Sequence, residues 1–213
     1  MIEIIPSINV DSFEEAIWRI KLVEPYVNWV HLDISDGVFT KHVSWHNPVD
    51  LMDFDTKIKI EVHLMVDKPE TKIDEWLLTP AQRFIFHQES TKNHDLIIER
   101  IHNAGKEAGI AISPDTPWLK LFPYFGKVEL VQLLAVSPGP SGQVFKEEMI
   151  HKLGHVKSIC HPCRAEVDGG VNFKNAPALI KEGADILVAG KAIFDAKDPV
   201  SAIEKLKTLN PNI

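Results

Sequence analysis

The feature that most constrains the fold is a regular alternation along the chain. Short runs rich in β-branched and apolar residues are each followed by a longer amphipathic stretch. The runs with strand character are Ile2–Pro6, Trp29–Asp33, Ile58–Met65, Arg83–His87, Gly109–Ile112, Leu130–Ala135, Ala165–Val167 and Ile186–Val188. The stretches with helical character are Phe13–Val23, Pro48–Met52, Glu70–Leu77, Asp95–Ala104, Trp118–Leu121, Lys146–Lys157, Ala176–Glu182 and Pro199–Leu206. Strands that alternate with helices form parallel sheets, so we expect an α/β fold.

The number of strand–helix pairs favours a closed sheet over an open one. Eight pairs within 213 residues predict one (β/α)8 (TIM) barrel domain over residues 1–213. An open, doubly wound sheet is the alternative, but no G-x-G-x-x-G sequence follows the first strand. Asp11 or Ser12 can cap the first helix, and Gly105 and Gly183 suit helix C-termini.

Composition excludes several classes of protein. The net charge is −7 without a basic tail, which argues against a nucleic-acid partner. No apolar run approaches the roughly 18 residues of a membrane span, and the N-terminal residues lack the pattern of a secretory signal. We therefore expect a cytoplasmic protein without a membrane partner. Cys160 and Cys163 are too few for a disulfide framework, and we expect two free thiols.

Four potential metal ligands stand at the ends of predicted strands, where barrel enzymes place their chemistry. His31 and Asp33 are two residues apart and so share one strand face. His63 and Asp168 end the third and seventh strands and can converge on the same cavity. Two imidazoles and two carboxylates suit one Zn²⁺, Mn²⁺, Fe²⁺ or Co²⁺ ion. Each pattern alone is common in structural polar pairs, and the prediction depends on all four occurring together.

Six segments resemble the ribulose-phosphate 3-epimerase family, in order and over nearly the whole chain. They are Ile5-Pro6-Ser7, His31-Leu32-Asp33-Ile34-Ser35-Asp36-Gly37, Glu61-Val62-His63-Leu64-Met65, Ser137-Pro138-Gly139-Pro140-Ser141-Gly142-Gln143, Glu166-Val167-Asp168-Gly169-Gly170-Val171 and Val188-Ala189-Gly190-Lys191-Ala192-Ile193-Phe194. The resemblance implies a (β/α)8 barrel that interconverts ribulose 5-phosphate and xylulose 5-phosphate.

The resemblance also implies roles for individual residues. His31, Asp33, His63 and Asp168 would hold one divalent metal ion per chain, and Asp33 and Asp168 would also be the catalytic acid and base. A phosphorylated ketose would be the substrate, and we expect a homo-oligomer. The residues implied in substrate binding are Ser7, His63, Met65, Gly139, Pro140, Ser141, Gly142, Gly169, Gly170, Gly190 and Lys191.

The residue types fit this chemistry. Epimerisation beside a ketone needs one proton removed from a carbon atom and another returned to its opposite face. Two carboxyl groups, one on each side of that carbon, can do both tasks within hydrogen-bonding reach. The intermediate is an enediolate, whose negative charge a metal ion would stabilise as a Lewis acid. Backbone amides after the seventh and eighth strands would receive the phosphate.

The chain departs from the family pattern around the substrate. The family usually has methionines at three positions, where this chain has Ser35, Met65 and Leu134. The loop after the sixth strand has Pro140 and Ser141 where the family has Phe and Gly, so an amide donor and backbone freedom are lost. Lys191 replaces a small residue and can either pair with the phosphate or remain solvated.

These departures leave other functions open. The same site could act on a hexulose phosphate such as allulose 6-phosphate, which the pocket near Ser35 would decide. A phosphate-sugar or metal binder without turnover is a second class, although the intact Asp33 and Asp168 pair argues against it. A third is another phosphate-binding barrel, such as a decarboxylase or a synthase, which has no need of the His-Asp-His-Asp set.

Two further groups of residues have more than one interpretation. Cys160 and Cys163 could form a second zinc site with His151 and His155, but free cysteines and solvated histidines are favoured. His87, at the end of the fourth strand, could lie behind the metal ligands or serve only as a structural hydrogen-bonding group.

Overall fold

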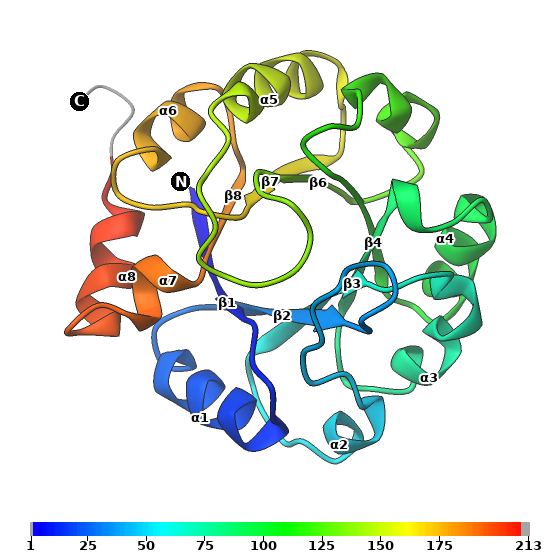
Figure 1. The fold of residues 1–213 in the computed structure, drawn as a ribbon, viewed down its shortest axis with the longest axis horizontal. Helices are drawn as coiled ribbons and strands as arrows, with labels where there is room; N and C mark the ends of the chain where they lie inside the picture. Colours follow the sequence, from blue (N-terminus) through cyan, green and yellow to red (C-terminus); the bar gives the residue numbers. More distant parts are fainter. Residues whose placement is uncertain (1, 210–213) are drawn as a thin grey trace.

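The computed structural model describes residues 2–209, and its eight strands close into a barrel (Figure 1). The strands are β1 (Glu3–Ile8), β2 (Trp29–Ser35), β3 (Lys59–Met65), β4 (Arg83–His87), β5 (Glu107–Ile112), β6 (Leu130–Leu134), β7 (Arg164–Asp168) and β8 (Ile186–Ala189). The α-helices are α1 (Phe13–Val23), α2 (Pro48–Met52), α3 (Ile73–Leu77), α4 (His94–Asn103), α5 (Glu148–Ile159), α6 (Ala176–Lys181), α7 (Lys191–Phe194) and α8 (Pro199–Lys207). Three 3₁₀ helices are η1 (Pro69–Thr71), η2 (Gln88–Ser90) and η3 (Trp118–Tyr124).

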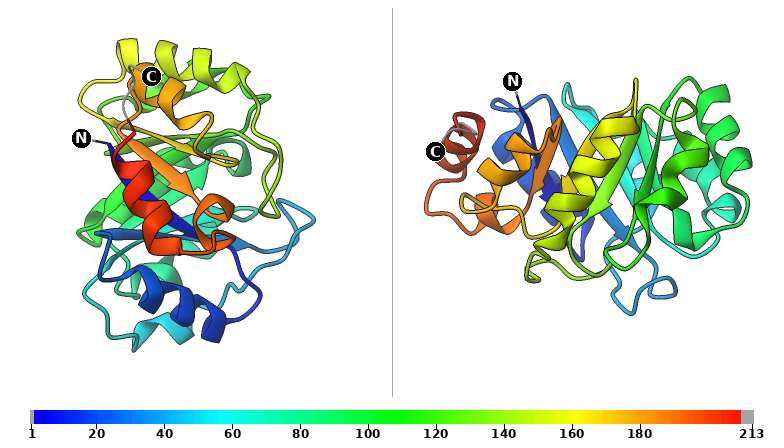
Figure 2. Two further views of the ribbon diagram at one scale, coloured as in Figure 1. Left: turned by 90° about the vertical axis from the view of Figure 1, so that its left-hand side faces the viewer. Right: turned by 90° about the horizontal axis from the view of Figure 1, so that it is seen from above.

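Closure of the sheet decides between the two expected topologies. Every strand pairs in parallel with the next one along the chain, and β8 pairs with β1 through Glu3 and Ile186. The helices form a ring outside the strands (Figures 1 and 2). The predicted TIM barrel is therefore confirmed, and an open doubly wound sheet is wrong.

The strands are buried on both faces. Alternate residues along a strand point to opposite faces, either into the barrel or toward the helices. In β2, Val30, Leu32 and Ile34 belong to the core between strands and helices. Trp29 belongs instead to a separate apolar cluster. Because side chains alternate along a strand, His31 lies on the inward face with Trp29. The sequence period of two thus places polar residues inside the barrel without disturbing the outer core.

The apolar cluster inside the barrel is small. It consists of Ile5, Trp29, Ile85, Ala111, Leu130, Ile186 and Val188, which come from six different strands. The remaining inward-facing space is filled by buried polar and charged side chains. The barrel interior is therefore a packed core with an apolar part and a charged part.

Helix boundaries follow the expected signals at several ends. The Ser12 hydroxyl accepts a hydrogen bond from the Glu15 amide at 3.2 Å and so caps α1. Gly105 and Gly183 follow α4 and α6 with φ of 71° and 94°, which glycine adopts without a steric penalty.

Three helices differ from expectation. The predicted helix Glu70–Leu77 is divided into η1 and α3. The predicted helix Trp118–Leu121 is the 3₁₀ helix η3, which contains Pro123 and so lacks one amide donor. The short helix α7 after β8 was not predicted, because four residues are too few to show a helical period.

The cysteines also differ from expectation. Cys160 and Cys163 are paired in a disulfide with their Cα atoms 5.6 Å apart, so the prediction of two free thiols is wrong. A three-residue separation after the end of α5 allows this close approach. His155 stacks on Trp118, with the ring planes 9° apart. Within residues 2–209, the groups of side chains able to hold a metal ion do not include these cysteines.

Among the described residues, no helix is long and apolar enough to cross a membrane. This finding agrees with the sequence, which contains no apolar run of that length.

The packing inside the barrel predicts a stability effect at Gly109. A Cβ atom there would lie 2.8 Å from Cγ1 of Ile85 and 3.2 Å from Cδ2 of Leu130. We expect Gly109→Ala to lower the free energy of unfolding by about 1–3 kcal/mol through overpacking, measured by urea denaturation. In an Ile85→Ala background the same substitution should cost less, because the crowded atom is gone. Equal costs in both backgrounds would contradict this explanation.

Candidate active site

The four predicted metal ligands meet at the carboxyl ends of three strands. His31 and Asp33 lie on β2, and strand pairing sets Asp33 opposite His63 on β3. Asp168 ends β7, which is separated from β2 by β1 and β8. All four side chains are buried. The closed barrel therefore brings together residues that are far apart in the sequence.

The ligand atoms face one another at short range. His31 Nε2 lies 3.4 Å from Asp33 Oδ1 and 3.8 Å from Asp168 Oδ2. His63 Nδ1 lies 3.0 Å and 3.7 Å from the same two oxygen atoms. One atom from each of the four residues falls within 4.8 Å of the others.

This donor set fits a divalent cation. His31 Nε2 is buried and has no hydrogen-bond partner. A buried polar atom left without a partner costs free energy, which a bound cation would recover. Two imidazole nitrogens and two carboxylate oxygens are ligands that Zn²⁺ and related transition metals prefer.

Further side chains hold these ligands in place. The Ser7 hydroxyl donates to Asp33 Oδ2 at 2.7 Å, and the Gln132 amide donates to Asp168 Oδ2 at 3.2 Å. His87 Nε2 lies 2.9 Å from His63 Nε2, so His87 is in direct contact with one of the predicted metal ligands. Gln132 was not recognised from the sequence. Its inward position becomes apparent only once β6 is paired with β7, which sets Gln132 opposite Glu166.

The two carboxyl groups differ in their ionisation. Burial opposes ionisation of Asp33, but the neighbouring His31 and His63 outweigh it and lower the pKa of Asp33. Burial and the negative charge of Asp33 raise the pKa of Asp168 to about 7. For His31, burial disfavours the charged form, yet Asp33 and the other carboxylates around it raise the pKa of the ring well above its usual value. Near pH 7 and without a metal, Asp33 is therefore ionised and Asp168 is partly protonated.

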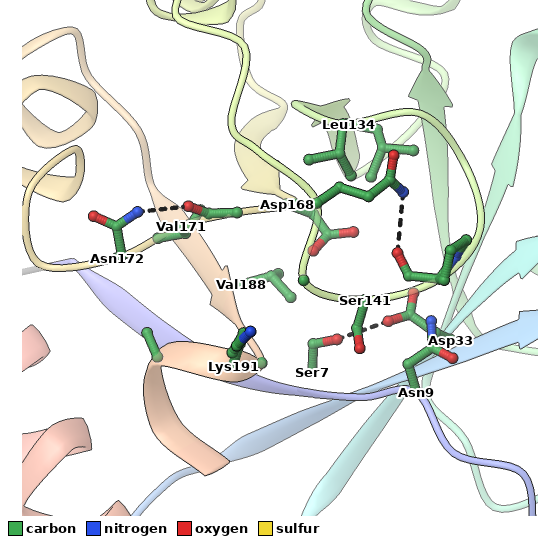
Figure 3. Close-up of a pocket in the computed structure, with 18 of the residues that line it drawn as sticks. Ser7, Asn9, Asp33, Leu134, Ser141, Asp168, Val171, Asn172, Val188 and Lys191 are labelled. Atoms are coloured by element: carbon green, nitrogen blue, oxygen red, sulfur yellow. Dashed lines mark hydrogen bonds between the residues drawn. The ribbon is translucent and has the colours of Figure 1, made fainter. Parts of the chain in front are cut away.

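A cavity of about 480 Å³ opens next to these carboxylates (Figure 3). This volume suits a small phosphorylated metabolite. Asp33 and Asp168 reach the cavity from separate strands, with Ser7 beside Asp33. The predicted substrate-binding residues that line the cavity are Ser7, Met65, Gly139, Pro140, Ser141, Gly142, Gly169, Gly170, Gly190 and Lys191. His63 is fully buried behind the lining.

The turn after β7 needs glycine at two positions. Gly169 and Gly170 have φ of 94° and 68°, in the region that side chains rarely adopt. A Cβ atom on Gly169 would lie 2.6 Å from Cγ2 of Val136, and one on Gly170 would lie 2.9 Å from the Phe145 amide nitrogen. Glycine at these two positions lets the turn pack closely against Val136 and Phe145, which lie in the segment after β6.

The positions that depart from the family pattern are placed differently around the cavity. Met65 and Leu134 line it, and Lys191 stands at its rim with 68% of its side chain exposed. Ser35 is fully buried, and its hydroxyl has no hydrogen-bond partner. Lys191 Nζ lies 3.8 Å from Asp195, so a weak surface ion pair leaves the ammonium group available to an anion.

The loops after β2 and β6 lie at the same end of the barrel and contact each other (Figure 2). The Thr40 hydroxyl donates to the Pro138 carbonyl at 3.0 Å, and the Asn9 amide donates to the Gly139 carbonyl at 3.1 Å. His42 Nε2 lies 2.9 Å from the Asn9 side-chain oxygen. These bonds hold the β6 loop across the barrel mouth (Figure 1).

Comparison with known proteins identifies the family of this chain. The sequence model of the ribulose-phosphate 3 epimerase family matches residues 3–194. The chain belongs to this family. Ribulose-phosphate 3-epimerase of Schizosaccharomyces pombe is 34% identical over 184 residues, which cover 84% of this chain and 81% of the yeast protein. The Bacillus subtilis ribulose-phosphate 3-epimerase is 32% identical over 215 residues, which cover 97% of this chain and 99% of the bacterial protein. This membership identifies the chain as an epimerase, an isomerase that acts on carbohydrates.

Solved structures with the same fold include enzymes of other kinds. The 3-hexulose-6-phosphate synthase of Salmonella typhimurium superposes with a TM-score of 0.74, covering 96% of both chains at 13% identity. The orotidine 5'-phosphate decarboxylase of Pyrococcus horikoshii gives a TM-score of 0.69 at 16% identity, covering 97% of this chain and all of that one. These likenesses establish the barrel alone, while the sequence match establishes the epimerase family.

The ionisation of the site predicts that metal binding displaces protons. A cation needs Asp168 ionised and His31 neutral, whereas the raised pKa of each group keeps protons on them in the metal-free protein. We expect Zn²⁺ to bind with proton release at pH 7 and its apparent affinity to rise as pH increases from 6 to 8, by up to about tenfold per pH unit for each proton displaced. Calorimetric titration in buffers of different ionisation enthalpy measures this release, and heats independent of the buffer would contradict it.

Proposed function

We propose that this epimerase inverts C3 of D-ribulose 5-phosphate to give D-xylulose 5-phosphate, with Asp33 and Asp168 as the acid–base pair. The observation that carries the proposal is the meeting of these two carboxyl groups, from separate strands, beside a cavity of about 480 Å³. The names of the yeast and bacterial relatives support the substrate.

The proton transfers need one carboxyl group on each side of the reacting carbon. One carboxylate removes the C3 proton, and the electron pair of the broken C–H bond moves into an enediolate that includes the C2 oxygen. The other carboxylic acid returns a proton to the opposite face of C3, and the C2 ketone forms again. Asp33 and Asp168 reach the cavity from different strands, so one can take the C3 proton while the other gives one. The reverse reaction exchanges these roles.

A divalent cation held by His31, Asp33, His63 and Asp168 would supply Lewis-acid stabilisation of the charge that develops on the substrate oxygens. The protein's own contribution is to orient the two carboxyl groups. Ser7 fixes Asp33 and Gln132 fixes Asp168 through hydrogen bonds to one oxygen of each. The β6 loop, held by Thr40, limits access of bulk water to the reacting carbon.

The phosphate of the substrate would lie in the part of the cavity that is formed by two glycine-containing turns. Gly170, Gly190 and Lys191 line that part, on the turns after β7 and β8. Backbone amide groups of these two turns are the phosphate donors that we expect.

Asparagine at either catalytic position tests the proposal. Asp33→Asn and Asp168→Asn each keep the side-chain shape but lose the proton-transfer group, so we expect exchange of the substrate C3 proton with solvent deuterium to fall by at least about 100-fold. Exchange is followed by NMR, and circular dichroism checks that the barrel stays folded. Substantial exchange in either folded variant would remove that carboxyl group from the mechanism.

Lys191 is expected to contribute to phosphate binding. Lys191→Met removes a partly solvated charge at the cavity rim, and we expect KM to rise up to about fivefold with kcat little changed. Lys197→Met removes the same charge from an exposed position that does not line the cavity, and it serves as the matched control. Equal KM values for the two variants would show that Lys191 remains solvated.

A hexulose phosphate such as allulose 6-phosphate is the second candidate substrate. Ser35, next to Met65 across the β2–β3 pairing, is smaller than the methionine usual in the family and keeps an unpaired hydroxyl. The same deuterium-exchange assay with both substrates distinguishes them. Faster exchange with the hexulose phosphate would replace the pentulose assignment.

A further inference from the structure

A network of buried charges lies behind the metal ligands and takes no part in the proposed proton transfers. Strand pairing sets Glu61 of β3 between His31 of β2 and Arg83 of β4, and Arg83 pairs in turn with Glu107 of β5. Glu61 is fully buried, and only 1% of Arg83 is exposed. Buried ions of this kind are costly unless each is paired, so their arrangement is specific.

The two oxygen atoms of Glu61 have different partners. Oε1 lies 2.7 Å from His31 Nδ1, and Oε2 accepts from Arg83 Nη1 at 2.6 Å. Arg83 is fixed on its other side, because its Nε donates to Glu107 at 2.8 Å and its guanidinium lies 4.2 Å from the centre of the Trp29 ring. Glu61 therefore has little freedom to turn away from the histidine.

This contact determines which nitrogen of His31 faces the metal ligands. A carboxylate can only accept a hydrogen bond, so the proton of the neutral ring lies on Nδ1, toward Glu61. The lone pair is then on Nε2, the atom that faces Asp33 and Asp168 and has no partner of its own. Carboxylates behind a ligating histidine are known to fix its tautomer and increase its basicity.

We propose that Glu61, held by Arg83, is a positioning residue that presents His31 Nε2 to the catalytic cation. The proposal rests on the metal site of the proposed function and adds to it a residue that touches neither substrate nor metal.

The same region does not suit a second cation. His31 Nδ1 and one oxygen each of Glu61 and Glu166 are also within 4.8 Å of one another. However, Arg83 already supplies a positive charge to Glu61, and a cation on Nδ1 would displace the proton that Glu61 accepts. One metal ion per chain is therefore expected, and two tightly bound ions would overturn the positioning role of Glu61.

The test compares two variants, each of which removes one of the two carboxylate groups that pair with Arg83. Glu61→Gln removes the partner that also contacts His31, whereas Glu107→Gln removes the outer partner and leaves the His31 contact in place. We expect Glu61→Gln to weaken Co²⁺ binding roughly 10- to 100-fold and to alter the visible spectrum of the Co²⁺ protein. Glu107→Gln should change both much less, because Arg83 keeps its contacts with Glu61 and Trp29. The thermal unfolding of the metal-free variants reports any general loss of stability.

The outcomes separate this proposal from the proposed function. If the unaltered protein binds no Co²⁺, the metal site itself is wrong. If the unaltered protein binds one Co²⁺ and Glu61→Gln binds it equally well with the same spectrum, Glu61 has no positioning role and the metal site stands. An equal loss of affinity in Glu107→Gln would likewise overturn the role of Glu61.

A measurement on the unaltered protein keeps the proposal testable if Glu61→Gln does not fold. The ¹⁵N chemical shifts of His31 in the Zn²⁺-loaded protein show which ring nitrogen carries the proton. We expect the proton on Nδ1 and the metal on Nε2, and the opposite assignment would overturn the proposal.

Discussion

The cost of burying charge is the constraint on which the arrangement of this barrel depends. His31, Asp33, His63 and Asp168 are all buried among parallel strands, where isolated ions are unfavourable. The structure meets this cost by surrounding each group with partners of opposite charge or with hydrogen-bond donors. Glu61 stands behind His31, Ser7 beside Asp33 and Gln132 beside Asp168. His31 Nε2 is buried without a hydrogen-bond partner and faces Asp33 and Asp168.

The same constraint explains why the interior is divided between apolar and charged side chains. Trp29 belongs to the inner apolar cluster and also lies against the guanidinium of Arg83. Arg83 connects this packing to Glu61 and thus to His31. A change in the packing of the barrel can therefore reach the ligand geometry through a short series of direct contacts.

The sequence predicts much of this fold because the relevant signals are local. Alternating strand and helix patterns are sufficient for the barrel, and the two-residue spacing of His31 and Asp33 correctly places both on one inward face. Their convergence with Asp168 was predicted from strand ends alone. The short helix α7 escaped prediction because a period cannot be recognised in four residues.

Other features could not be predicted from the sequence because they depend on how the strands pair and on how the chain turns. Glu61 and Arg83 are 22 residues apart, and only strand register sets them side by side. Gln132 meets Asp168 in the same way. The Cys160–Cys163 disulfide depends on how the chain turns after α5, and composition alone gave the opposite expectation.

The fold by itself does not determine the chemistry. A synthase and a decarboxylase share this barrel at 13% and 16% identity, so the positions of the strands are compatible with different reactions. In this chain, two histidines and two carboxyl groups at the strand ends occupy one buried cluster. The pKa values of the two carboxyl groups are displaced in opposite directions, although both side chains are aspartates in the same cluster. Asp33 lies closer to both imidazoles than Asp168 does, and the negative charge of Asp33 in turn opposes ionisation of Asp168.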